Sequence, residues 1–483
     1  MRHVLTFPLL ALTLFCSAAQ AVETPAASPS PSPVPPASSS APVTAPANPP
    51  AASFFLTLTE AIDVALRSHY DVLLAEEKIK DARLQITETS AQGMPQLSLT
   101  ASYGRQDPIR LGSASDTSGG AGGGGLGSNP QLAAFLGLAS VNTFQSRLTL
   151  SQLLFAGFRI VDGVRLAQIN VGLMEESLRL ARQNVAYQVT NAYFNALRSW
   201  EVAQLDKESL EQAREQVRMA EARLRAGAGV KLDILQAQSQ VIQIQQRLSQ
   251  DMGTFEKAKM SLNLAMGREA DYPVELNRQA TVIDLDKEET DSLKNSLDMR
   301  SEVRQLAMQK EMSELNATIQ GRSIWPTISA QVVYSLQDNQ VTGGNTNNVQ
   351  NMNYSLNMNW PIFDGLAANA KAQRAQQSAT QAQINLDQLR QRVIVEVKQA
   401  YLDIQESKER MMMAQAGVQV AEENLRVARV SYREGVGIGM DVLNAQLTLL
   451  QAKNSLITVR FDLNTRLARL YQSLGLDILD RLR

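Results

Sequence analysis

The chain has 483 residues, of which 44% are hydrophobic, and its 46 Lys and Arg nearly balance its 48 Asp and Glu. This balance gives no support to nucleic-acid binding, because proteins of that class concentrate Lys and Arg in one patch or domain. The single cysteine, Cys16, lies close to the N-terminus, so we expect no disulfide once an N-terminal signal is removed.

The N-terminal segment 1–21 has the parts of a secretory signal peptide. A charged start precedes an apolar stretch, and residues 19–21 form an A-x-A cleavage site. A lipoprotein signal would instead use Cys16, but Phe15 stands before it where a small residue is normal. The sequence therefore predicts export and the loss of residues 1–21.

Residues 22–53 are mostly Pro, Ala and Ser, a composition that buries too little apolar area to offset the entropy of ordering. We expect a disordered leader there, serving either as an extended spacer or as a plain linker. No later apolar run reaches the roughly 18 residues of a transmembrane helix. Any membrane span in the predicted structure would therefore be made of β-strands.

The sequence contains an internal duplication. The segment AYFNAL at Ala192 recurs as AYLDIQ at Ala400, an offset of 208 in the numbering, whereas MPQLSL and WPTISA align Pro95 with Pro326, an offset of 231. The larger upstream offset locates an insertion in the first copy. It falls between two predicted strands, in the Gly- and Ser-rich segment GSASDTSGGAGGGGLGS, which we expect to be an exposed loop.

Each copy is predicted to run helix, strand, loop, strand, very long helix, tight turn, long helix. We place the first repeat at 54–267, a linker of irregular or mixed structure at 268–290, the second repeat at 291–475 and a tail at 476–483. Residues 163–225 lack proline and repeat apolar residues every three or four positions. Such a helix would extend roughly 95 Å. The helices alone would also suit a solid coiled-coil rod.

Residues 351–360 alternate polar and apolar side chains, the pattern of a strand with one wet and one apolar face. Their number matches the roughly 9 to 11 residues of a tilted membrane strand. The predicted lipid face consists of Met352, Tyr354, Leu356, Met358 and Trp360. Further strands are predicted at 328–336, 97–103 and 143–154. A soluble sheet would show similar alternation, but four strands cannot close a barrel, so several chains would have to contribute.

The duplication, the LFAGFR segment that leaves a predicted strand and the segment YREGVGIGMDVLNAQ together resemble the TolC-like outer-membrane efflux protein family over residues 54–475. The resemblance implies a mainly α fold with a membrane β-barrel. In it, four strands of each duplicated chain complete a trimeric twelve-stranded barrel on a long α-helical tunnel.

The resemblance also implies a function. The homotrimer would be a passive duct in the outer membrane, with a long periplasmic extension and contact with outer-membrane lipid. Its partners would be a periplasmic adaptor and an inner-membrane efflux pump or secretion transporter. The alternative is a soluble periplasmic coiled-coil adaptor or structural protein, which would leave the strand at 351–360 without a purpose.

The family closes its tunnel at the periplasmic end, and the resemblance implies which residues do so here. Asp233 corresponds to the acid of the first hairpin, Tyr432 to the tyrosine that bonds to it, and Asp441 to an acid that lines the constriction. Asn444 replaces a second such acid, and Gly437 replaces the gate arginine of the archetype. The closed state is therefore expected to rely less on ion pairs, or to use a different basic residue such as Arg225, Lys231 or Arg433. Asp233 and Asp441 would equally suit the first turn of a helix.

Glycines concentrate at both predicted hairpin turns, where they would permit positive φ angles. The resemblance implies that an adaptor docks at these turns, which contain Gly227, Gly229, Gly435, Gly437 and Gly439. The sequence shows no catalytic motif, metal spacing or cofactor motif, so we expect neither an enzyme nor a metal or cofactor site. His69 is expected at a helix start or on the surface.

Overall fold

The computed structural model describes residues 55–106, 141–227, 229–277, 299–341 and 347–478. The predicted signal peptide, the predicted leader and the Gly-rich loop lie outside these ranges. All described elements belong to one compact unit, Ser53–Arg483.

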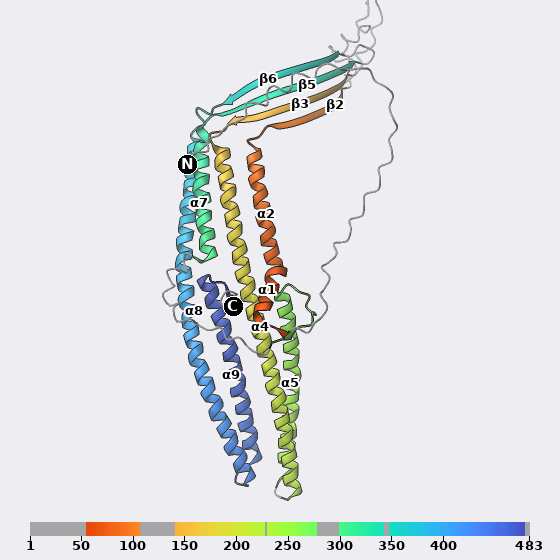
Figure 1. Ribbon diagram of the computed structural model, residues 1–483, viewed down its shortest axis with the longest axis vertical. Helices are drawn as coiled ribbons and strands as arrows, with labels where there is room; N and C mark the ends of the chain where they lie inside the picture. The colour runs from red at the N-terminus through yellow and green to blue at the C-terminus, as the bar shows by residue number, and fades with distance from the viewer. Residues whose placement is uncertain (1–54, 107–140, 228, 278–298, 342–346, 479–483) are drawn as a thin grey trace, which may run out of the picture. The chain divides into compact units, whose positions relative to one another are not determined.

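The described elements follow the predicted order of helices and strands (Figure 1). Those of the first half are β1 (Phe55–Leu56), α1 (Leu58–Ser68), α2 (Tyr70–Ala91), β2 (Gln96–Gln106), β3 (Val141–Phe155), α4 (Arg159–Arg225), α5 (Lys231–Ala265) and β4 (Glu275–Leu276). Those of the second half are α7 (Ser301–Gly321), a short 3-10 turn (Arg322–Ile324), β5 (Thr327–Val341), β6 (Asn347–Asn359), α8 (Ala367–Arg433) and α9 (Gly439–Leu474).

The two halves correspond element by element. Helices α4 and α8 each have 67 residues, and their starts differ by 208 in the numbering, whereas the starts of β2 and β5 differ by 231. The backbone repeats as well, because Phe158 and Leu366, which precede α4 and α8, have φ angles of 63° and 69°. The offsets of 208 and 231 between repeated sequence motifs are thus also the offsets between corresponding helices and strands.

Strands β2, β3, β5 and β6 form one antiparallel sheet in that order, as Figure 1 shows. The register brings Leu99, Leu148, Tyr334 and Met352 into one row across the four strands. Apolar side chains therefore share one face of the sheet, and this face is exposed in the single chain. Among the described strands, β2 and β6 have a partner on one side only.

The main hydrophobic core lies among the helices, away from the sheet. Phe194 of α4 and Phe461 of α9 are almost fully buried there, with ring centroids 6.3 Å apart. The Tyr193 hydroxyl donates to the carbonyls of Leu56 and Asn277, 3.0 Å and 3.3 Å away. These bonds fasten the parallel pair β1 and β4 to α4, so part of the predicted linker has a defined structure.

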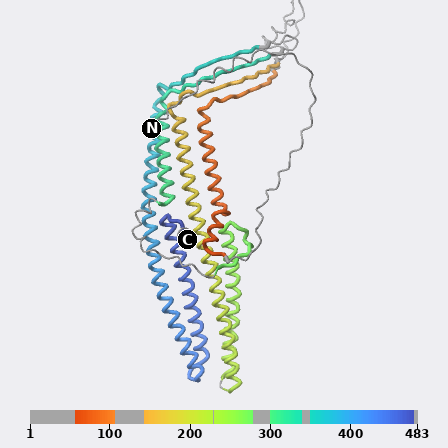
Figure 2. Tube along the Cα trace, viewed as in Figure 1, coloured from red at the N-terminus to blue at the C-terminus, as the bar shows by residue number. Residues whose placement is uncertain are grey.

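Helices α4 and α5 form hairpin 1, and α8 and α9 form hairpin 2; both are visible in Figure 2. His69 is the N-cap of α2, and its Nδ1 accepts a hydrogen bond from the Asp71 amide at 3.2 Å. The predicted position at a helix start is therefore correct. Within the described ranges, no helix combines the length and the apolar character that a transmembrane helix requires.

The φ angles of Gly267 and Gly365 provide a matched test of packing. Both are left-handed, at 71° and 67°, but a Cβ on Gly267 would lie 2.7 Å from the Ser68 carbonyl oxygen, whereas one on Gly365 would meet nothing within 4 Å. Gly267→Ala should therefore lower the free energy of unfolding by more than Gly365→Ala, which carries only the conformational cost of about 1 to 2 kcal/mol. Thermal unfolding of the two variants checks this. Equal destabilisation would contradict the predicted close contact.

Candidate functional site

The candidate site lies where the turns of the two hairpins meet. At each turn one glycine is left-handed, Gly227 with φ 75° and Gly435 with φ 82°. Gly229, Gly437 and Gly439 are not among the glycines with positive φ angles. Gly229 and Gly437 instead allow close packing, because a Cβ on either would lie 3.0–3.1 Å from a neighbouring residue.

A hydrogen bond joins the two hairpins. The Tyr432 hydroxyl, at the end of α8, donates to Oδ2 of Asp233, in the first turn of α5, at 3.3 Å. Tyr432 is 7% exposed and packs in the apolar core of hairpin 2. Burial and the nearby Asp233 carboxylate raise the pKa of Tyr432, whereas Arg223 opposes this. The phenol therefore remains a hydrogen-bond donor at neutral pH.

Arg223, in the last turn of α4, makes a second link between the hairpins. Its guanidinium donates to the Tyr432 carbonyl and lies over the Tyr432 ring, with Cζ 4.3 Å from the centroid. Sequence reasoning named Arg225, Lys231 and Arg433 for this role and missed Arg223. The available signal was the helical position of Arg223, one turn before the glycine turn, but no periodicity distinguished it from Arg225, which contacts its own helix at the Glu221 carbonyl.

The remaining predicted residues of the hairpin ends lie on α9. Asp233 approaches Gly439, since a Cβ there would lie 3.3 Å from the Asp233 carboxyl carbon. Gly439 therefore permits the close approach of α5 and α9. The Asp441 carboxylate accepts from the Ile438 amide at 3.5 Å in the first turn of α9. The side chains of Asp441 and Asn444 are exposed, so only Asp233 and Tyr432 of the four predicted residues meet in one chain.

Apolar side chains are exposed around both turns. They belong to the residues next to the turn glycines and to the first turns of α5 and α9. The set consists of Val230, Leu232, Leu235, Val436, Ile438 and Met440, each at least 38% exposed. Exposed side chains of this size in one region are typical of a surface that binds another protein.

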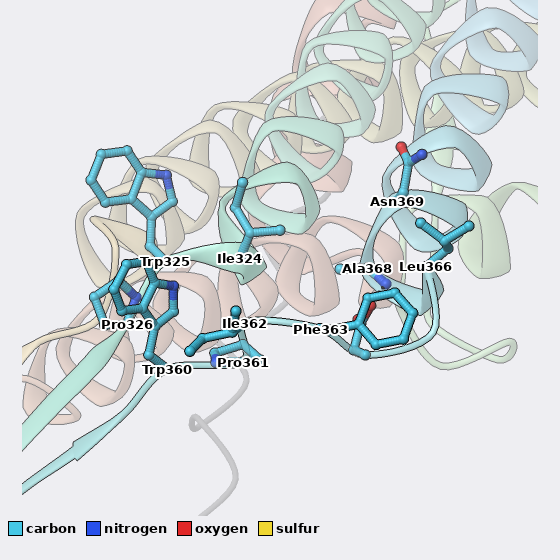
Figure 3. Close-up of a pocket in the computed structure, with 11 residues that line it drawn as sticks. Ile324, Trp325, Pro326, Trp360, Pro361, Ile362, Phe363, Leu366, Ala368 and Asn369 are labelled. Carbon is cyan, nitrogen blue, oxygen red and sulfur yellow. Dashed lines mark hydrogen bonds between the residues drawn. The ribbon is translucent and has the colours of Figure 1, made fainter.

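A second apolar region lies where the sheet joins α8. A pocket of about 510 Å³ there is lined by Trp325, Pro326, Trp360, Pro361 and Phe363, among others. Figure 3 shows Trp325 and Trp360 near Pro326. Trp360 is half exposed and follows directly after the end of β6, so it lies one residue beyond the strand to which it was assigned. Phe155 packs edge-on against Trp325 with centroids 6.4 Å apart. Such aromatic groups are common at the interfacial ends of membrane strands.

The predicted lipid-face residues that precede Trp360 lie within β6. Met352, Tyr354, Leu356 and Met358 alternate along this strand, and each is more than half exposed. Each also lies opposite an apolar or aromatic residue of β5, such as Val332 opposite Tyr354. Among the described residues, no group of three or more His, Cys, Asp or Glu side chains could hold a metal ion.

Comparisons with known proteins agree with the fold. Residues 61–268 and 292–476 match the model of a family described as outer membrane efflux protein. The outer membrane efflux protein BepC of Brucella suis is 24% identical over 322 residues, covering 65% of this chain and 68% of BepC. The cation efflux system protein CusC of Escherichia coli is 23% identical over 420 residues, covering 86% of this chain and 85% of CusC.

Solved structures share the architecture. A CusC structure superposes with a TM-score of 0.71 at 19% identity, covering 88% of this chain and 94% of that one. VceC of Vibrio cholerae does so with a TM-score of 0.67 at 18% identity, covering 86% of this chain and 96% of VceC. These likenesses confirm the predicted combination of long helices and a strand domain. The family model matches well over half of this chain, so the chain belongs to the outer membrane efflux protein family.

Proposed function

We propose that the chain is one subunit of a passive exit duct that crosses the outer membrane and the periplasm. The observation that carries the proposal is the open sheet with an exposed apolar face, joined directly to two long helical hairpins. Lipid would cover the apolar face, and the helices would enclose the periplasmic part of the path. The duct needs no catalytic residue, cofactor or metal of its own, and its energy would come from partner proteins.

The proposed duct requires several copies of the chain. Unpaired N–H and C=O groups on the outer edges of β2 and β6 would have no partner in lipid, and pairing β6 of one copy with β2 of the next satisfies them. Three copies would supply the twelve strands of a closed barrel. Helix α8 supports lateral association, since exposed apolar residues recur along it every seven or eleven positions, at Val395, Leu402, Met413, Val420 and Val427.

The contacts at the hairpin turns suit a gate. Tyr432 links hairpin 2 to Asp233 and Arg223 of hairpin 1, so separating the hairpins would break a hydrogen bond to a carboxylate and a cation–π contact. Asp441 and Asn444 lie on α9 of hairpin 2 with exposed side chains. We infer that a periplasmic adaptor docks on the exposed apolar residues of both turns. In a tripartite efflux or type I secretion system, an inner-membrane transporter would then drive opening.

The gate proposal predicts the effect of removing the polar link. Asp233→Asn combined with Tyr432→Phe should raise single-channel conductance in planar bilayers, because a hydrogen bond to a charged group is worth about 1.5 to 3 kcal/mol. A loss of this size would shift the closed-to-open ratio by roughly tenfold or more. Unchanged conductance in a folded oligomer would exclude these two residues from gating.

The two arginines at the end of α4 allow a matched comparison. Arg223→Ala should widen the distribution of distances between spin labels on the two turns, because it removes the carbonyl bond and the contact with the Tyr432 ring. Arg225→Ala removes the same charge two residues away and should leave the distribution as in the unmodified chain. Pulsed electron paramagnetic resonance measures both, and an equal effect of the two variants would argue against a specific role for Arg223.

The proposal that the apolar face of β6 contacts lipid can be tested by placing an arginine on one face of the strand or on the other. Leu356→Arg should reduce the protein that stays in the outer-membrane fraction after an alkaline carbonate wash, because an arginine facing lipid near the midplane costs about 2 to 4 kcal/mol. Asn353→Arg, on the opposite face of the same strand, should be tolerated. If the unmodified chain itself is released by the wash, a soluble periplasmic helical protein becomes the better explanation.

A further inference from the structure

Hairpin 1 buries an acidic side chain midway along its length. Asp206 of α4 is 2% exposed, and its Oδ2 has no hydrogen-bond partner among the described groups. A buried carboxylate without donors is costly, so such a group either finds a cation or keeps a proton. Asp206 takes no part in the proposed gate, which lies at the far end of the same helix.

The group that faces Asp206 across the hairpin is another acid. The Asp251 side chain of α5 lies within hydrogen-bond reach of Asp206, so the pair can share one proton. Arg247, also on α5, is the cation that acts on Asp206. If both carboxyl groups were ionised within hydrogen-bond reach of each other between the two helices, their repulsion would exceed the attraction of Arg247 for Asp206.

Helix α9 packs against hairpin 1 at this level, but its charged groups are engaged elsewhere. Asp462 pairs with Arg198 of α4 at 3.6 Å, and Arg460 pairs with Glu201 of α4. Lys453, a second cation of α9, pairs with Glu422 of α8 at 3.3 Å. The cations of α9 therefore do little to offset the negative charge of Asp206 and Asp251.

A small polar cavity adjoins the pair. Its volume is about 180 Å³, and Asp251 lines it together with Arg198, Ser199, Val202, Thr254, Asn454 and Thr458. The hydroxyls of Ser199, Thr254 and Thr458 donate to carbonyls four residues earlier, so their lone pairs remain available. Water in such a cavity would give Asp251 a path for proton exchange, whereas Asp206 is buried behind it.

We propose that Asp206 and Asp251 form a proton-sharing carboxyl pair that makes the packing of α4 against α5 sensitive to periplasmic pH. With one proton present, a hydrogen bond connects the two helices. Without it, two carboxylates face each other in the seam and favour local separation. The consequence for opening rests on the proposed function, because looser packing in hairpin 1 would make its turn easier to move away from hairpin 2.

The direction of the pH effect follows from the proton affinity of Asp206. Burial, followed by the hydrogen bond to Asp251 and the charge of Asp251, raises the pKa of Asp206 from 3.8 to about 7. The folded hairpin thus holds the proton more tightly than an opened one does. Its stability is greatest at acidic pH, falls as the pH rises from about 4 to about 7, and changes little above that range.

Hydrogen exchange of the full-length protein, followed by mass spectrometry from pH 5 to pH 8, tests the pair directly. After correction for intrinsic exchange, protection in segments 200–212 and 245–257 should fall roughly tenfold or more between pH 5 and 7 and then level off. Asp206→Asn preserves the shape and removes the titration, so its protection should be independent of pH. Glu208→Gln, which removes an exposed acid on the same helix, should behave as the unmodified chain does.

A pH dependence in Asp206→Asn equal to that of the unmodified chain would overturn the proposal. Asp251→Asn provides a second variant should Asp206→Asn fail to fold, and it should reduce the dependence by removing the carboxyl–carboxyl contact. This measurement needs no conductance or membrane assay. Failure of the carboxyl-pair proposal is therefore distinguishable from failure of the proposed duct function.

Discussion

The backbone groups at the two edges of the four-stranded sheet impose the constraint on which the rest of the account depends. Each strand has a row of N–H and C=O groups on both sides, and in one chain β2 and β6 use one side only. An apolar face would favour lipid, yet lipid offers nothing to the free edge groups. A single chain therefore has an apolar surface suited to lipid that it cannot use alone, and the proposed association with further copies would resolve the conflict.

The proposed association of several chains would also determine how the helices are arranged. A sheet that closes only between chains would place α4 and α8, which follow β3 and β6, side by side around a common axis. The exposed apolar positions along α8 suit such lateral contacts better than contact with water. The link between Asp233, Tyr432 and Arg223 then lies at the end farthest along the chain from the strands, where movement of the hairpins would disturb the sheet least.

Charge is distributed unevenly along hairpin 1. At the turn, the Asp233 carboxylate accepts a hydrogen bond from Tyr432, and Arg223 lies over the Tyr432 ring. Midway up the hairpin, Asp206 has an acidic neighbour and an oxygen without a partner. The turn contact resists separation of the hairpins, whereas the acid pair weakens the hairpin from within at neutral pH. Both act on the same two helices, so their effects on hairpin position would combine.

Features that depend on periodicity and repetition were accessible from sequence. The alternation at residues 351–360 predicted β6 to within a few residues, and the constant offset between the later motifs predicted two equal long helices. Lateral contacts between helices were less accessible, because they depend on the rotation of each helix about its axis. Arg223 and Arg225 look equivalent in sequence, yet only Arg223 lies over Tyr432. Asp206 likewise looks like a surface acid until its helix is packed against α5.

The particle mass of the detergent-purified protein, measured by native mass spectrometry, tests the central claim most directly. The account predicts a single species of three chains, because only closure between copies pairs the edges of β2 and β6. A stable monomer that retains the strands and stays soluble without detergent would contradict it. In that case the apolar sheet face would have to be covered within one chain, and the duct would lose its physical basis.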